Sequence, residues 1–115
     1  MTSTPDILSL ARRHAEAGRL AECRALCLRL AADCPDDLPT QLDIGALLSS
    51  YGFLTDARAC YEKAQTLTPT DLRAQVNLAN LARDAGKHAE ARRLYTELLR
   101  QLPDHPVIRR NALTS

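Results

Sequence analysis

The chain has 115 residues, of which 45% are hydrophobic and 25% are charged, proportions that fit a globular domain and exclude a disordered one. Fifteen lysines and arginines nearly balance 14 acidic residues, and a net charge of +1 gives no overall attraction to nucleic acid or to an anionic membrane. The N-terminus lacks a basic stretch followed by an apolar run, and the longest clear apolar run, residues 44–48, is far below spanning length. We therefore expect a soluble, cytoplasmic protein that binds neither nucleic acid nor membranes.

Two residue types that interrupt helices recur with one period. Glycines recur every 34 residues, at Gly18, Gly52 and Gly86. Prolines recur with the same spacing, at Pro35, Pro69 and Pro103. This period in a helix-forming sequence indicates a repeated pair of helices, A and B, with a turn at the glycine and a break at the proline. The predicted units are residues 4–37, 38–71 and 72–105, and residues 106–115 restart the unit and stop at its tenth position.

The first unit is the most divergent of the three. Cys23 and Cys27 are four residues apart on one helix face, so we expect them to pack as small apolar residues. His14 falls on the core side of helix A, which predicts a partly buried packing residue rather than a catalytic one. Cys34, in the loop before Pro35, is expected to be exposed. The spacing of these cysteines is not a zinc pattern, and no metal or cofactor is expected.

The central unit shows the packing pattern most clearly. In helix A, the small residue Gly45 follows Ile44 on the core face and allows the neighbouring helix to approach closely. In helix B, Ala57, Tyr61 and Ala64 share one face, so the tyrosine ring can fill the space that the small residues leave. The pattern predicts two tightly interlocked helices.

Helix starts are marked by acidic residues and a proline. Asp37 and Asp71 precede the A helices of the second and third units, where a carboxylate can accept bonds from free backbone N–H groups. Pro39 fits the first turn of a helix, where its missing N–H has no effect. Residues 106–115 begin a further A helix without its B partner, which suggests either that the natural protein continues or that two chains cover each other.

These units resemble the tetratricopeptide repeat. The central unit matches its pattern at several positions: Ile44, Gly45, Gly52, Ala57, Tyr61, Ala64 and Pro69. The third unit matches at Leu78, Ala79, Gly86, Ala91, Tyr95 and Pro103, and the first at Leu10, Ala11, Gly18 and Pro35. Gln41 departs from the family, which carries a large apolar residue there. The resemblance implies an all-α fold, a right-handed α-solenoid of helix-turn-helix repeats.

The family's A helices line a concave groove that binds peptides or proteins. Residues on the side of these helices away from the core are therefore the candidate partner-binding residues: Ser9, Arg12, Asp43, Arg73, Asn77, Asn80 and Asn111. The asparagines can bond a peptide backbone without reading its side chains. They weakly resemble the asparagine ladder in the repeat domain of O-linked N-acetylglucosamine transferases, although Ser9 and Asp43 interrupt the pattern.

A second binding mode of the family is disfavoured. Some relatives grip a terminal carboxylate with lysine, asparagine and arginine side chains, whereas here only Arg12 and Arg73 supply cationic donors and Asp43 would repel a carboxylate. No nucleophile has a plausible base beside it, so we expect no enzymatic activity.

We therefore expect a protein-interaction module. Two alternatives remain: the chain is the N-terminal repeat portion of a larger enzyme, such as a bacterial glycosyltransferase, and orients its protein substrates, or it self-assembles as a homodimer through an uncapped C-terminal face.

Overall fold

The computed structural model of the chain describes residues 3–113, and these form seven helices and no strand. The helices are α1 (Thr4–Glu16), α2 (Leu20–Asp33), α3 (Leu38–Ser50), α4 (Leu54–Leu67), α5 (Leu72–Asp84), α6 (His88–Gln101) and α7 (Pro106–Leu113). Residues 114 and 115 of the predicted last segment lie outside the described residues.

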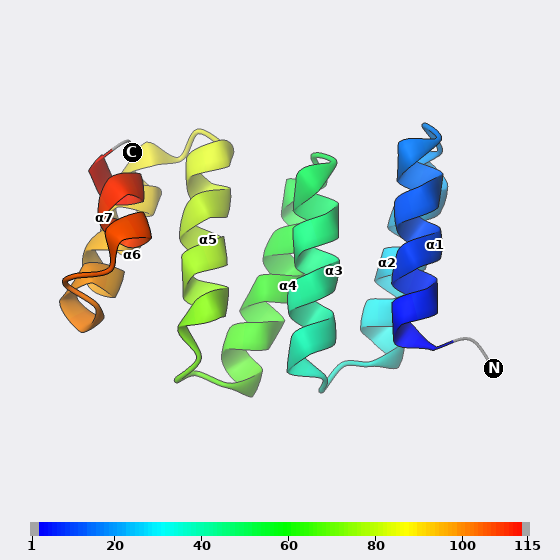
Figure 1. Ribbon diagram of the computed structural model, residues 1–115, viewed down its shortest axis with the longest axis horizontal. Helices are drawn as coiled ribbons and strands as arrows, with labels where there is room; N and C mark the ends of the chain where they lie inside the picture. The colour runs from blue at the N-terminus through cyan, green and yellow to red at the C-terminus, as the bar shows by residue number, and fades with distance from the viewer. Residues whose placement is uncertain (1–2, 114–115) are drawn as a thin grey trace.

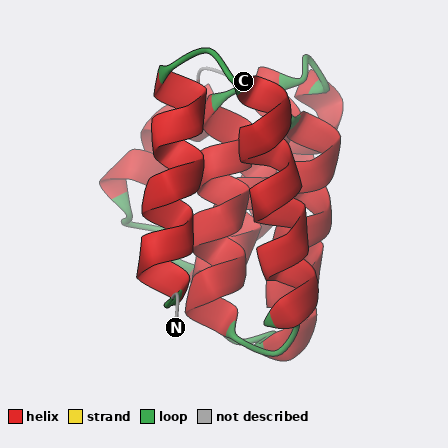
Figure 2. Cartoon of the chain, turned by 90° about the vertical axis from the view of Figure 1, so that its right-hand side faces the viewer, coloured by secondary structure: helices red, strands yellow, loops and turns green. Residues whose placement is uncertain are grey.

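Three helical hairpins stand side by side along the longest of the 44 × 28 × 20 Å axes. In Figure 1, α1, α3 and α5 lie in front and α2, α4 and α6 behind them, with α7 in front of α6 at the C-terminal end. Short loops join successive helices at the helix ends, mainly at the top and bottom of the view in Figure 2. The predicted solenoid of helix-turn-helix repeats is confirmed.

The turns within the hairpins need glycine. Gly18, Gly52 and Gly86 have φ angles of 83°, 86° and 78°, in the left-handed region that residues with a Cβ adopt at a cost. No heavy atom lies within 4 Å of a Cβ built at any of them. The requirement for glycine at these turns is therefore conformational and not steric.

Only one of the two predicted aspartate caps forms. Asp71 accepts a bond from the backbone N–H of Arg73 at 3.0 Å, as predicted. The prediction for Asp37 is wrong, because its carboxylate accepts a bond from the hydroxyl of Thr40 and caps no backbone group. Thr40 is 3% exposed, and a buried hydroxyl requires a partner.

The core contains the small and large residues that the sequence pairs. Ala57, Tyr61 and Ala64 of α4 are buried, and a Cβ built at Gly45 would lie 2.5 Å from Cε1 of Tyr61. Such a separation is too short for any real Cβ. Gly45 therefore permits the close approach of α3 and α4 that the sequence predicts.

Cysteines fill the core between the first two hairpins. Cys23 and Cys27 are buried, as predicted, and Cys60 of α4 is 4% exposed. Burial raises the pKa of Cys27 to about 12 and that of Cys60 to about 11, because a thiolate loses its hydration there. Cys34 is half-buried against this core, so the expectation of an exposed thiol is wrong.

Candidate functional site

A groove separates α1 from α3. It has a volume of about 690 Å³ and is lined by Ser9 and Arg12 from α1 and by Asp43, Ala46 and Ser50 from α3. All five are exposed, because they lie on the sides of α1 and α3 that face away from the packed hairpins. We call this the first groove.

A second groove lies between α3, α5 and the corner before α7. Its volume is about 520 Å³, and its lining is more apolar, with Leu42, Val76 and Ile108 beside Asn77 and Arg73. Ile108 is 1% exposed and Leu42 8%, so both form part of the packed interior beneath the groove. We call this the second groove.

Asp43 and Ala46 line both grooves. They lie three residues apart on α3, and so face the same way from the middle helix of the front row. The first and second grooves therefore adjoin along α3, and five of the candidate residues line one or both of them: Ser9, Arg12, Asp43, Arg73 and Asn77.

The charges in the grooves are unevenly compensated. Arg73 pairs with Asp71, with 2.6 Å between Nη2 and Oδ2, and the bonds from its side chain and backbone N–H lower the pKa of Asp71 to about 2. Arg12 and Asp43 form no ion pair within residues 3–113. Arg12 therefore has no ion-pair partner in the first groove, while Asp43 lies near enough to Arg73 for its charge to help raise the pKa of that guanidinium.

The remaining two candidates, Asn80 and Asn111, line neither groove. Oδ1 of Asn80 accepts a bond from Nδ2 of Asn111 at 3.1 Å and a second bond from the hydroxyl of the buried Tyr95. The asparagine ladder is therefore divided: Asn77 lines the second groove, while Asn80 and Asn111 join α5 to α7. This intramolecular role of Asn80 and Asn111 was not predicted from the sequence.

Two further residues, Gln41 and His105, have roles that the sequence did not predict. Gln41 is 2% exposed, and its Nε2 donates to the carbonyls of Ala31 at 3.1 Å and Cys34 at 3.0 Å. The sequence marked this position, because Gln41 stands where the family carries a large apolar residue. His105 lines the second groove from the loop before α7, where no pattern in the sequence marks it.

Metal sites and membrane spans were also sought among the side chains and helices of residues 3–113. No three of their histidine, cysteine, aspartate and glutamate side chains are grouped so as to hold a metal ion. None of the described helices is long and apolar enough to cross a membrane.

Comparisons with known proteins agree with this architecture. Residues 72–114 match the family model of the tetratricopeptide repeat. The fold is similar to the crystal structure of the Sgt2 TPR domain from Aspergillus fumigatus, with a TM-score of 0.69 over 96% of this chain and 75% of that one. The chain has the fold of a tetratricopeptide repeat domain, and residues 72–114 match that family. The predicted resemblance is confirmed.

The similarity to the tetratricopeptide structure shows the fold of the chain and not its function or its partner. Sequence identity to the Sgt2 domain is 15%, and no curated protein matches the chain by sequence. In this family's terms, α1, α3 and α5 are A helices and α2, α4 and α6 are B helices. The two grooves lie along the A helices of the tetratricopeptide stack.

Proposed function

We propose that this chain is a protein-interaction module that holds a partner peptide or protein along α1, α3 and α5 and catalyses no reaction. The observation that carries this proposal is that Asp43 and Ala46 line both grooves, so that the A helices offer one extended surface. An extended chain lying across three helices can make polar contacts at each of them.

The composition of the surface suggests how a partner is held. Arg12 and Asp43 offer charge-assisted bonds of opposite sign, and Asn77 offers both an acceptor and donors. Leu42 and Val76 provide apolar contact in the second groove. Tyr51, half-buried at the C-terminal end of α3, lines the first groove, but none of the candidate residues is aromatic. We therefore expect modest affinity, with selectivity that comes mainly from charge placement.

The state of the cysteine thiols indicates the compartment in which we expect the protein to work. All four cysteines are free, and three of them are buried in the core of the first two hairpins. A fold that packs reduced cysteines suits a reducing compartment, which supports the cytoplasm as its location. The partner is a protein, and no cofactor takes part.

Affinity capture from the source-cell lysate under reducing conditions tests this function. The test variant carries Arg12→Glu and Asp43→Lys, which leaves the net charge unchanged and reverses both groove charges. The control carries Arg29→Glu and Asp33→Lys, the same pair of charge reversals at two exposed residues of α2 that line neither groove. We expect a partner to be held by the native chain and the control and lost by the test variant. Equal capture by all three would contradict groove binding.

A further inference from the structure

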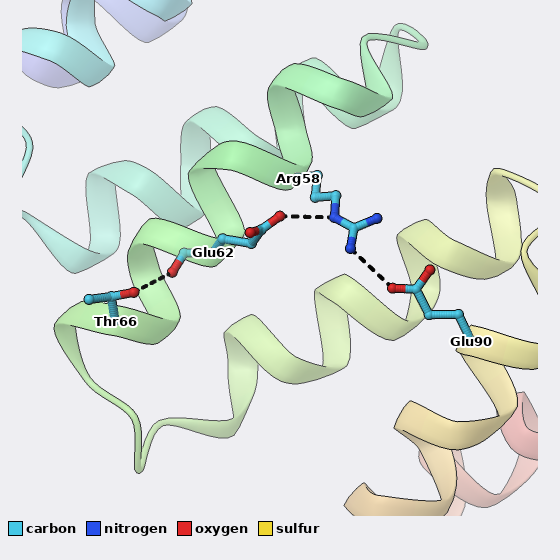
Figure 3. Close-up of polar contacts among 4 residues, drawn as sticks. All are labelled: Arg58, Glu62, Thr66 and Glu90. Carbon is cyan, nitrogen blue, oxygen red and sulfur yellow. Dashed lines mark hydrogen bonds and ion pairs between the residues drawn. The ribbon is translucent and has the colours of Figure 1, made fainter.

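Ion pairs link the B helix of each hairpin to the B helix of the next. Arg24 of α2 pairs with Asp56 of α4, with 2.6 Å between Nε and Oδ2. Arg58 of α4 reaches Glu90 of α6, with 3.1 Å between Nη2 and Oε1, while its Nε bonds Glu62 on its own helix (Figure 3). The arginines are 34 residues apart, and so are their partners on the next helix. We call these two pairs the arginine–acid ladder.

Both ends of the arginine–acid ladder are open. The same spacing continued forward from Arg58 reaches Arg92 on α6, and continued backward from Asp56 it reaches Glu22 on α2. Both side chains are exposed, and neither forms an ion pair within the described part of the chain. One end of the molecule therefore presents an unpaired acid, and the other end an unpaired arginine, in the same register.

The end that carries Glu22 also exposes apolar surface. Leu10 stands in α1 where Ile44 stands in α3, yet Leu10 is 39% exposed and Ile44 is 0% exposed. Gln41, three residues before Ile44, bonds to α2, so this side of α3 packs on the preceding hairpin. Leu20, at the start of α2, is also 39% exposed. Within the described residues, the first hairpin thus exposes the surface that α3 buries.

We propose that the chain associates head to tail with a second copy, the first hairpin of one molecule docking on α6 of the other. Glu22 of one copy then pairs with Arg92 of the next and continues the arginine–acid ladder across the junction. Leu10 gains the cover that α2 gives to Ile44. A second copy fits this end because its first hairpin carries both the acid and the apolar surface in the required register. The junction joins two different surfaces, so it can be repeated along a row of molecules.

Two features limit the strength of this junction. The last helix, α7, packs beside α6 through Ile108, where α1 of the incoming copy would lie, although α7 has 8 residues against 13 in α1. Arg13 of α1 stands where α3 and α5 carry Leu47 and Leu81, each 5% exposed. Association therefore exchanges α7 for α1 and must accommodate a charged side chain. We expect it to be weak and to increase with protein concentration.

Analytical ultracentrifugation in low salt with reductant tests the junction. The mass of the native chain should rise with protein concentration up to about 1 mM. Arg92→Glu alone and Glu22→Arg alone each place like charges across the junction, and each should weaken association by about tenfold. An equimolar mixture of the two variants restores opposite charges at both kinds of junction, so it should associate as the native chain does.

Arg93→Glu serves as the matched control, because Arg93 is the exposed neighbour of Arg92 and lies outside the ladder register. It should leave association unchanged, and circular dichroism of each variant verifies that the helices are intact. A native chain that stays monomeric at all concentrations would overturn the proposal. So would a mixture that associates no better than its components, or an Arg93 variant as weak as the Arg92 variant.

Discussion

Gly45 of α3 lies against the ring of Tyr61 of α4, so closely that a Cβ at Gly45 would stand 2.5 Å from Cε1 and 2.9 Å from Cδ1 and Cζ. The third hairpin has alanine in the equivalent place, Ala79, together with the buried Tyr95. The third hairpin thus buries an alanine and a tyrosine at the positions where the second has Gly45 and Tyr61. In the second hairpin, the Tyr61 ring leaves no room for a Cβ at Gly45.

Replacing Gly45 by alanine should destabilise the chain. Overpacking of a buried contact costs about 1–3 kcal/mol, and the better helix propensity of alanine returns up to about 1 kcal/mol. We expect the free energy of unfolding, measured by urea denaturation, to fall by about 1–2 kcal/mol. In a Tyr61→Leu background the same replacement should be neutral or stabilising, because the ring is gone. An equal loss in both backgrounds would contradict the steric explanation.

Gln41 should matter more than the residue in the same place of the next repeat. Its two bonds satisfy carbonyls at the end of α2, and the Ala31 carbonyl has no helical donor because Pro35 lacks an N–H. Gln41→Leu should therefore cost about 1–3 kcal/mol of unfolding free energy even though it restores the family's apolar residue. Gln75 makes one longer bond, of 3.4 Å, to the Pro69 carbonyl. Gln75→Leu is the control and should change stability far less; equal losses would contradict the assigned role.

The bond between Asn80 and Asn111 should hold α7 in place. Asn111→Ala removes this bond to Asn80, and we expect the amides of α7 to exchange with solvent about fivefold faster, since a hydrogen bond contributes about 1 kcal/mol. Arg110→Ala, at an exposed position of the same helix, is the control. Unchanged exchange in α7 of the Asn111 variant would show that other contacts fix this helix.

The buried thiols should make the fold sensitive to alkali. The pKa values of Cys27 and Cys60 are raised to about 12 and about 11 from the ordinary value of 9.0, because burial disfavours the thiolate. The unfolded chain therefore loses these protons first, so their contribution is complete below pH 9 and is lost as the pH rises toward 11–12. Urea unfolding at increasing pH should show this loss, and Cys27→Ala should reduce its slope. An unaltered slope in that variant would contradict the assignment.

Much of this fold follows from spacing in the sequence. The glycines mark the turns because only they take a positive φ without strain, and the helices end shortly before the recurring prolines. The contact between Gly45 and Tyr61 follows from the pairing of small and large residues on facing helices. These rules depend on residue types at fixed positions, and the glycine and proline positions recur in each repeat.

Other features depend on tertiary context that spacing does not encode. Asp37 bonds to Thr40 because that hydroxyl is buried, which is known only once α3 packs on α2. The three asparagines look alike in the sequence, yet Asn77 lines a groove and Asn80 bonds to Asn111 because α7 lies beside α5. The candidate surface could therefore be located to a face of the A helices, but its polar groups could not be sorted into exposed and bonded ones.

Site-specific photo-crosslinking tests whether the partner lies along the A helices. A photoreactive amino acid is placed at Ser9, in the first groove, at Asn77, in the second, or at Lys63, an exposed residue of α4 that lines neither. With the captured partner present, we expect covalent products from Ser9 and Asn77 and none from Lys63. Products from Lys63 alone, or equal products from all three positions, would contradict binding in the grooves.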